Sequence, residues 1–470
     1  MILAIIVNEW KGFVRDKIFL FLVGLFTLSL ILVTWFGFLQ NSAQSAAQHH
    51  AHDHIRAQWD AMEPSNPHRA AHYGTYAFKP ISVLNSLDEG VNSVTGNVLR
   101  LEGHTQNDVM FSETSQSLLV SQFGKLKPAL LFQFLIPLFL IFLSFNSYAS
   151  ERTSGRLKLL FVQGSSIPTI VFSKALSIWM IGVMLLSVAA LTQFLLAHHG
   201  LNYDATLRLL LFLLSYGVYY WIVIGLTVAL SILFQSATAS LSLMIAIWVT
   251  WTLFFPKIIG QAVEQIVPLQ SRIEFQDSIK EDRAKGLDGH NPSDERRKKL
   301  EADTLNQYNV ENLKDLPINF AGIVMQADEE YGNQVWDKHF GDVYDRLEQQ
   351  KRIVQRSGFI NPFGALQSLS MGMSGTDMFH HLEFLKQAEA YRRVFIQTLN
   401  DEYAFGGAKT GERGWKADTE FFKSVKDFEY LHPNLSMVFS KYTLDALSLL
   451  FWFAASILLL ISVSKRASVS

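Results

Sequence analysis

Six stretches of apolar residues interrupt the sequence and predict a protein that spans a membrane. A helix rises about 1.5 Å per residue and the hydrocarbon layer is about 30 Å thick, so a spanning helix needs about 20 mainly apolar residues. Lys174 and Asp445 are the charged residues inside these stretches, each near an end, where we expect their side chains to reach the interface. The predicted spans are residues 18–40, 128–148, 170–197, 209–234, 239–256 and 443–463.

The N-terminal segment, residues 1–14, has the pattern of an amphipathic helix. Its apolar side chains gather near one helical face, with Asn8, Glu9 and Lys11 elsewhere. Such a helix is expected to lie along the inner membrane surface, although a simple extension of the first span is the alternative. The apolar residues are Ile2, Ile5, Ile6, Trp10 and Phe13.

Two long insertions lie between spans. The first, residues 41–127, follows the first span and has mixed character, and the second, residues 257–441, follows the fifth span and is long enough to fold by itself. Apolar residues of the second recur at intervals of three and four, as at Trp336, Phe340, Val343 and Leu347, which predicts helices. Its elements are expected to be separated by the helix breakers Pro317, Gly332, Pro362, Gly375, Gly406 and Gly407.

These patterns predict an all-α membrane protein with six transmembrane helices, an N-terminal interfacial helix and a mostly helical extracytoplasmic domain. Its segments follow the predicted spans. They are 1–40 (interfacial helix and first span), 41–127 (first extracytoplasmic insertion), 128–256 (second to fifth spans, with a cytoplasmic helix at 149–168), 257–441 (large extracytoplasmic helical domain) and 442–470 (sixth span and cytoplasmic tail).

Composition and charge support this assignment. Apolar residues make up 49% of the 470 and charged residues only 17%, and residues 257–441 hold 29 acidic and 24 basic residues, so charge is scarce elsewhere. The net charge of -2 argues against a nucleic-acid partner, which requires clustered basic residues. The lack of cysteine excludes disulfides, thiolate metal sites and cysteine nucleophiles.

Basic residues near the span ends predict the orientation, because cytoplasmic loops accumulate Lys and Arg. An even number of spans puts both termini on one side. The basic residues identify that side, together with the loop between the second and third spans, as cytoplasmic. They are Lys11, Arg15, Lys17, Arg152, Arg156, Lys158, Lys174, Lys465 and Arg466.

Sequence signatures of common enzymes are absent. The string from Gly406 to Thr410 lacks the Gly-Lys-Ser/Thr core of a nucleotide-binding loop, and neither His-Glu-x-x-His nor Gly-x-Ser-x-Gly occurs. The spans are also almost empty of the ionisable groups that an intramembrane enzyme normally carries. We therefore expect a chain with no catalytic residues.

Histidines are concentrated after the first span, at His49, His50, His52 and His54. On a helix, His50 and His54 would share a face, as would His68 and His72, and neutral imidazoles suit copper, zinc or nickel. Histidine-rich stretches also occur as solvated helix surfaces. We assign no metal site, keep His50 and His54 as the candidates, and expect no tight metal binding there.

The cytoplasmic segment after the second span carries a family resemblance. Glu151, Gly155, Leu157 and Leu160 match the Glu-x-x-x-Gly-x-Leu-x-x-Leu pattern of ABC-2-type permeases, the membrane subunits of ATP-binding-cassette exporters. The two insertions resemble one branch, which has an outer domain of unknown function and includes permeases associated with multicopper-enzyme maturation. Outer residues that match are Asn361, Pro362, Gly375, Thr376, Asp377, His381, Phe384, Tyr391 and Arg392, and packing and capping of helices is the simpler role for them.

This resemblance implies a permease of the bacterial inner membrane that works with a separate ABC ATPase and a second permease, identical or related, to move a substrate outward. ATP and Mg²⁺ would bind the ATPase, and no cofactor would bind this chain. In the cytoplasmic segment, Leu157, Leu160 and Phe161 would dock on the ATPase, Glu151, Arg152 and Arg156 would set the orientation, and Gly155 would allow a close approach or a sharp turn.

Two other functions stay open. The chain could transmit ATPase motion to its outer domain without translocation, or it could be a membrane-anchored receptor or assembly factor. A continuous polar path between the spans would favour transport, a tightly closed bundle would favour transmission, and failure to find an ATPase partner would favour the receptor.

Overall fold

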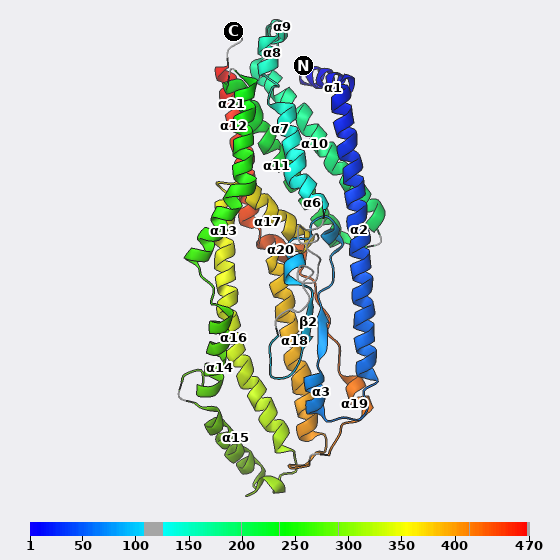
Figure 1. Ribbon diagram of the computed structural model, residues 1–470, viewed down its shortest axis with the longest axis vertical. Helices are drawn as coiled ribbons and strands as arrows, with labels where there is room; N and C mark the ends of the chain where they lie inside the picture. Colours follow the sequence, from blue (N-terminus) through cyan, green and yellow to red (C-terminus); the bar gives the residue numbers. More distant parts are fainter. Residues whose placement is uncertain (108–125, 199, 235, 290, 413, 468–470) are drawn as a thin grey trace.

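The computed structural model describes residues 1–107, 126–198, 200–234, 236–289, 291–412 and 414–467, so parts of the first insertion and of the predicted cytoplasmic tail lie outside the described residues. The molecule is elongated and mainly helical (Figure 1). Within the described residues, six helical segments are long and apolar enough to cross a membrane, which confirms the predicted fold class. They are Lys17–Asp60, Pro128–Thr153, Ile167–Ala197, Tyr203–Leu233, Ala237–Ile266 and Thr443–Arg466.

The spanning region occupies one end of the molecule, where α1, α8, α9 and the end of α21 also lie (Figure 1). Its elements are α1 (Ile2–Arg15), α2 (Lys17–Asp60), α6 (Pro128–Leu130), the π-helical turn η3 (Leu131–Leu135), α7 (Ile136–Ser144), α8 (Ala149–Thr153), α9 (Arg156–Val162), α10 (Ile167–Ala197), α11 (Tyr203–Leu233), α12 (Ala237–Val249), the π-helical turn η4 (Thr250–Phe254), α13 (Phe255–Ile266) and α21 (Thr443–Arg466).

The distal domain, defined as the described residues of 61–107 and 267–440, extends to the opposite end (Figure 1). Strands β1 and β2 pair antiparallel within it, from Thr75 opposite Leu101 to Phe78 opposite Val98. Its elements are α3 (Pro67–Tyr73), β1 (Thr75–Phe78), η1 (Val83–Ser86), α4 (Asn92–Thr95), β2 (Val98–Leu101), α14 (Arg272–Lys285), α15 (Ser293–Tyr308), η5 (Leu313–Asp315), α16 (Phe320–Ser357), α17 (Pro362–Ser374), α18 (Met378–Phe405), α19 (Thr419–Ser424) and α20 (Leu435–Ser440).

Two span helices continue beyond the ends predicted for the spans. Helix α2 is unbroken for 44 residues, about 66 Å at 1.5 Å per residue, and passes from the spans along the distal domain. The fifth span continues through Pro256 into α13, because this proline lies in the first turn after η4, where a missing N–H is tolerated. Hydrophobicity thus located the apolar part of each helix and not the helix end.

The predicted helix breakers agree with the structure except at Gly332. Pro362 opens α17 after its cap Asn361, Gly375 ends α17 with φ +72°, and Gly406 follows the last residue of α18. Gly332 was expected to separate two elements but lies inside α16, which is continuous. One glycine costs a helix about 1 kcal/mol, an amount that packing of α16 along α18 readily outweighs.

Helix α17 joins the distal domain to the spans through one apolar core. Phe363, Leu366 and Met373 of α17 are fully buried and belong to the same cluster as Phe132 and Tyr219 of the spans. The Phe363 ring lies 6.3 Å from the Tyr219 ring. The distal domain is therefore packed onto the span bundle and not suspended from it by linkers.

Buried polar contacts reinforce this junction. Asp445 was expected to reach the interface, but it is fully buried and accepts a hydrogen bond of 2.6 Å from Gln355 at the end of α16. The cause is tertiary, because α16 ends against the first turn of α21. Asn361 likewise donates to the carbonyl of Trp251 in η4 at 2.8 Å.

The crossing of α16 and α18 provides a test of this packing. A Cβ at Gly322 would lie 2.6 Å from the backbone nitrogen of Ala404, which cannot move away easily. We expect Gly322→Ala to lower the free energy of unfolding by about 1–3 kcal/mol, as overpacking usually does. Thermal unfolding of the full chain in detergent measures the effect.

Gly341→Ala is the matched control, because Gly341 lies in the same helix with nothing within 4 Å of an added Cβ. It should be neutral or raise stability by up to about 1 kcal/mol. Equal unfolding temperatures for the two variants would contradict the close crossing.

Candidate functional site

The segment α8–α9 forms a short helical hairpin at the end of the molecule that also holds α1 (Figure 1). Gly155 makes the turn between its helices with φ +75°, a left-handed conformation that favours glycine. An added Cβ at Gly155 would meet no atom within 4 Å. Gly155 therefore serves the sharp turn and not a close approach within this chain.

A cluster of charges holds this hairpin to its neighbours. The ammonium group of Lys174 in α10 donates to Glu9 of α1 at 2.6 Å and to Glu151 of α8 at 3.0 Å. Glu151 also lies 3.4 Å from the guanidinium of Arg156. We refer to Glu9, Glu151 and Lys174 as the charge clamp, because it ties together three helices that are distant in sequence.

The burial of Lys174 corrects the sequence prediction. Its side chain was expected to extend to the interface, but the residue is only 4% exposed. Burial of an ammonium group without a partner is costly, and two carboxylates remove that cost here. The sequence showed Lys174 close to Glu151, but only the fold brings Glu9 to the same point.

Backbone contacts fix the start of the hairpin on α11. Arg152 donates to the carbonyl of Phe234, just after α11, at 3.2 Å. The backbone N–H groups of Tyr148 and Ala149 both lie 3.3 Å from the hydroxyl of Ser231. A displacement of α8 would consequently act on α1, α10 and α11 together.

The apolar residues of α9 divide into a buried side and an exposed side. Leu157 is 1% exposed and packs in the core of this chain, with Leu160 packed against the same core. Leu159, Phe161 and Val162 are 64%, 52% and 84% exposed. The docking role expected for Leu157 is therefore revised, because a residue in the chain's own core is not available to a partner.

We call Leu159, Phe161 and Val162 the apolar tip. Sequence reasoning missed two of these residues, because five of the seven residues of α9 are apolar and a helix of two turns shows no clear apolar face. Only the position of α9 on the core separates the two sides.

Helix α1 lies beside this site and is separate from the first span. Its last residues are followed by Asp16, which is extended and caps α2 by accepting from Ile18 and Phe19. This break excludes α1 as a simple extension of the span. Ile5 and Ile6 are buried, whereas a second apolar row that includes Leu3 and Val7 is exposed, as an interfacial helix requires.

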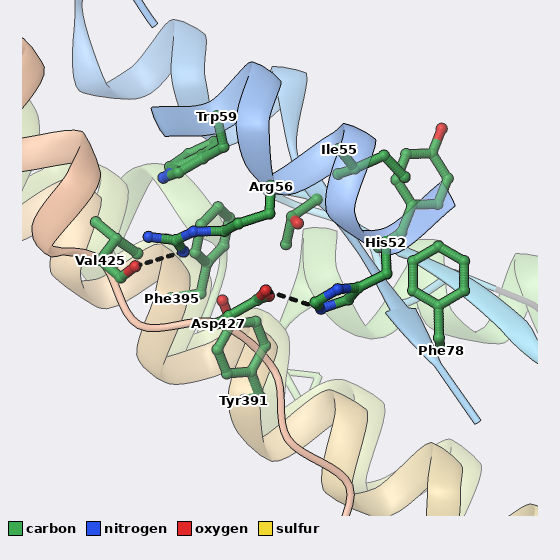
Figure 2. Close-up of a pocket in the computed structure, with 11 residues that line it drawn as sticks. His52, Ile55, Arg56, Trp59, Phe78, Tyr391, Phe395, Val425 and Asp427 are labelled. Carbon is green, nitrogen blue, oxygen red and sulfur yellow. Dashed lines mark hydrogen bonds and ion pairs between the residues drawn. The ribbon is translucent and has the colours of Figure 1, made fainter. Parts of the chain in front are cut away.

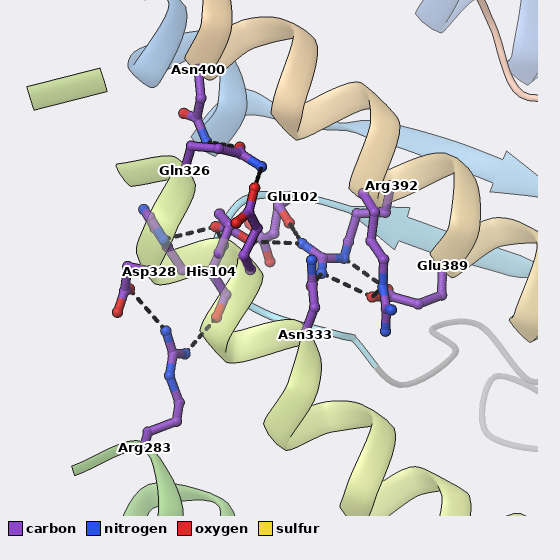
Figure 3. A network of polar contacts seen from close by, with 12 residues as sticks. Glu102, His104, Arg283, Gln326, Asp328, Asn333, Glu389, Arg392 and Asn400 are labelled. Atoms are coloured by element: carbon purple, nitrogen blue, oxygen red, sulfur yellow. Dashed lines mark hydrogen bonds and ion pairs between the residues drawn. The ribbon is translucent and has the colours of Figure 1, made fainter. Parts of the chain in front are cut away.

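The outer residues of the family pattern cap helices and fill the distal core. Asp377 accepts from the first N–H groups of α18, and Phe384 is fully buried. Arg392 is 1% exposed and donates to Glu389 at 2.7 Å and to Glu329 at 3.1 Å (Figure 3). These contacts agree with the packing role.

Glu329 is the central acceptor of this network. Burial opposes its ionisation, but hydrogen bonds from His104 and the charge of Arg392 outweigh burial and lower the pKa of Glu329 to about 2. The carboxylate is therefore ionised at neutral pH and can orient its donors.

The histidine-rich stretch lies on the distal half of α2. His52 faces Asp427 at 2.9 Å beside a cavity of about 10 Å³, room for one water at most (Figure 2). His50 and His54 are exposed, and in the described part of the chain they join no group of converging ligands. Instead, ring nitrogens of His68, His72 and His104 lie within 4.8 Å of one another.

Comparison with known protein families finds a match for each of two consecutive segments of the chain. A family model described as ABC-2 family transporter protein matches residues 78–269, which include the charge-clamp residues Glu151 and Lys174 and all of α8 and α9. A second model, a domain of unknown function named DUF3526, matches residues 272–431 of the distal domain. No curated protein matches the sequence. The chain thus contains an ABC-2 family transporter domain followed by a DUF3526 domain, which supports a multi-pass, permease-type membrane component of an ABC transporter.

Proposed function

We propose that this permease uses the apolar tip of α9 to dock a separate ABC ATPase and converts ATP hydrolysis into outward movement of a substrate. The observation that carries the proposal is the exposure of Leu159, Phe161 and Val162 on a short helix whose base is held by buried charges. Exposed apolar clusters of this kind are typical of protein interaction sites. ATP and Mg²⁺ would bind the ATPase, and this chain would bind no cofactor.

The charge clamp supports a transmitting role for the hairpin. Because Lys174 bonds both Glu9 and Glu151, a displacement of α9 would be transmitted to α1 and α10 through short contacts to a buried lysine. The hydrogen bond from Arg152 to the carbonyl of Phe234 would transmit the same displacement to the end of α11. Such rigid contacts allow the spans to switch between two packings as a unit.

Assembly and location belong to the same proposal. The active unit would contain a second permease, identical or related, and two ATPases in the bacterial inner membrane. Both termini and α8–α9 would face the cytoplasm, and the distal domain would lie outside. The common position of α1, α9 and the end of α21 supports this arrangement (Figure 1).

Force transmission without translocation is the second candidate. It is supported by α17, whose buried Phe363 and Leu366 share the core of the spans, and by α2, which extends from the spans along the distal domain. Motion of the spans would therefore move the distal domain. Substrate uptake into vesicles separates the two functions, since only the permease would move cargo.

Orientation can be tested by labelling, because the chain has no cysteine of its own. Ser154 precedes α9 and Ser293 begins α15, and both are exposed. An impermeant thiol reagent should label Ser293→Cys in intact cells and Ser154→Cys only after lysis. Labelling of Ser154→Cys in intact cells would reverse the proposed orientation.

Docking can be tested by removing the apolar tip. Joint replacement of Leu159, Phe161 and Val162 by alanine should weaken association with the ATPase by about tenfold or more, since each 1.4 kcal/mol lost is a factor of ten. Membrane yield should be unchanged because the three side chains are exposed. Copurification of the ATPase from native membranes and its hydrolysis rate are the measurements.

Leu157→Ala is the control from the same helix. It should lower stability by about 2–5 kcal/mol, as loss of a buried leucine does, without removing the docking surface. Normal association and normal coupled hydrolysis in the triple variant would refute docking through the tip.

Transmission can be tested at the charge clamp. Glu151→Gln removes one carboxylate from Lys174 and leaves Glu9 in place. We expect ATPase copurification to be retained while substrate-stimulated hydrolysis falls several-fold, because the hairpin loses its hold on α10. Retention of full coupling in Glu151→Gln would argue against the charge clamp as the transmitting contact.

A further inference from the structure

Three histidines from the first insertion converge within the distal domain. His68 and His72 lie one turn apart on α3, and their Nε2 atoms are 3.2 Å from each other. His104 follows β2, and its ring centroid lies 5.5 Å and 5.2 Å from those of His68 and His72. One ring nitrogen of each histidine lies within 4.8 Å of the other two.

His104 has an unusual backbone conformation, and contacts with neighbouring residues hold it there. Its φ of +64° is left-handed, which a residue other than glycine rarely adopts. Glu329 of α16 accepts from both the backbone N–H and, at 2.8 Å, Nδ1 of His104. Arg283 donates to its carbonyl at 3.0 Å (Figure 3). Such strain persists where surrounding contacts impose it, often at binding sites.

The contact with Glu329 determines which nitrogen of His104 is free. Because Nδ1 bonds the carboxylate, Nε2 is left to bind a ligand. A carboxylate behind a histidine is the usual support of a metal-binding imidazole, since it sets both the tautomer and the ring direction. Arg392 in turn holds Glu329 at 3.1 Å.

We propose that His68, His72 and His104 bind one divalent transition-metal cation, of the class of zinc or copper(II). Zinc binds imidazole nitrogen at about 2.0–2.1 Å, so two ligands at a tetrahedral angle lie about 3.3 Å apart. The observed 3.2 Å between His68 and His72 matches this spacing. A ring nitrogen of His104 lies within 4.8 Å of both and would move toward them when the ion binds.

The donor set selects the kind of ion and leaves one position open. Three neutral imidazoles suit zinc, copper or nickel and not magnesium or calcium, which prefer oxygen. A tetrahedral ion would keep a fourth position for water or another ligand, and the exposure of His72 gives access to it. The site would also connect the first insertion to α16 through Glu329.

Calorimetry on the full chain tests the site. The protein is purified in detergent through a tag without histidine, stripped with a chelator, and titrated with ZnCl₂ and, separately, CuCl₂. Binding of one ion per chain is expected for at least one metal, without competition from millimolar MgCl₂. His72→Ala should weaken that binding at least about tenfold, and because His72 is exposed the fold should be retained.

Two further variants separate this site from chance binding. His50→Ala with His54→Ala removes an exposed pair that has the same spacing on α2, and it should leave the affinity unchanged. Glu329→Gln should weaken binding by about 10–100-fold through His104, with thermal unfolding as the check on its fold. No stoichiometric binding, equal affinity in His72→Ala, loss of binding in the His50/His54 variant, or competition by Mg²⁺ would each overturn the proposal.

Discussion

The packing of α17 among the span ends is the contact on which the rest of the structure depends. The helix belongs to the distal part of the sequence, yet its apolar side chains, including Phe363 and Leu366, lie in the same core as the spans. Its cap Asn361 also bonds the carbonyl of Trp251. The Phe363 and Leu366 side chains are fully buried, so separating the two parts would expose apolar surface to water. The spans and the distal domain are therefore mechanically one body.

Buried charges restrict how that body can move. Lys174 between Glu9 and Glu151 acts at the end that holds α8–α9, and Arg392 between Glu329 and Glu389 acts in the distal domain. Each cation is stable in its buried position only while its carboxylates stay close, because an unpaired buried charge is very costly. Any conformational switch must therefore keep these groups together and move the helices that carry them as units.

Much of the architecture could be predicted from the sequence. The transfer of apolar residues into hydrocarbon is a property of each segment, so the six spans and the interfacial helix followed from local pattern. The family resemblance at Glu151 and Gly155 was likewise a local signal, and the family comparison confirmed it. The prediction of helix ends was poorer wherever the helix-breaking tendency of a single residue competed with the environment of the whole helix. Gly332 lies within a helix because packing along α18 outweighs the intrinsic preference of one residue, and the fifth span continues through Pro256 because this proline falls in the first turn after η4.

The sequence by itself determined the membrane class, the number of spans and the position of the hairpin that includes Gly155, since these depend on residues that are neighbours in the chain. Only the tertiary structure decided that Leu157 is core while Leu159 is surface, because burial depends on the helices that surround α9. The same holds for the histidines. The four-residue spacing of His68 and His72 is visible in the sequence, but His104 joins them through the pairing of β1 with β2, and Glu329 through the position of α16. Contacts between distant residues are selected by the energy of the whole fold, which no local pattern contains.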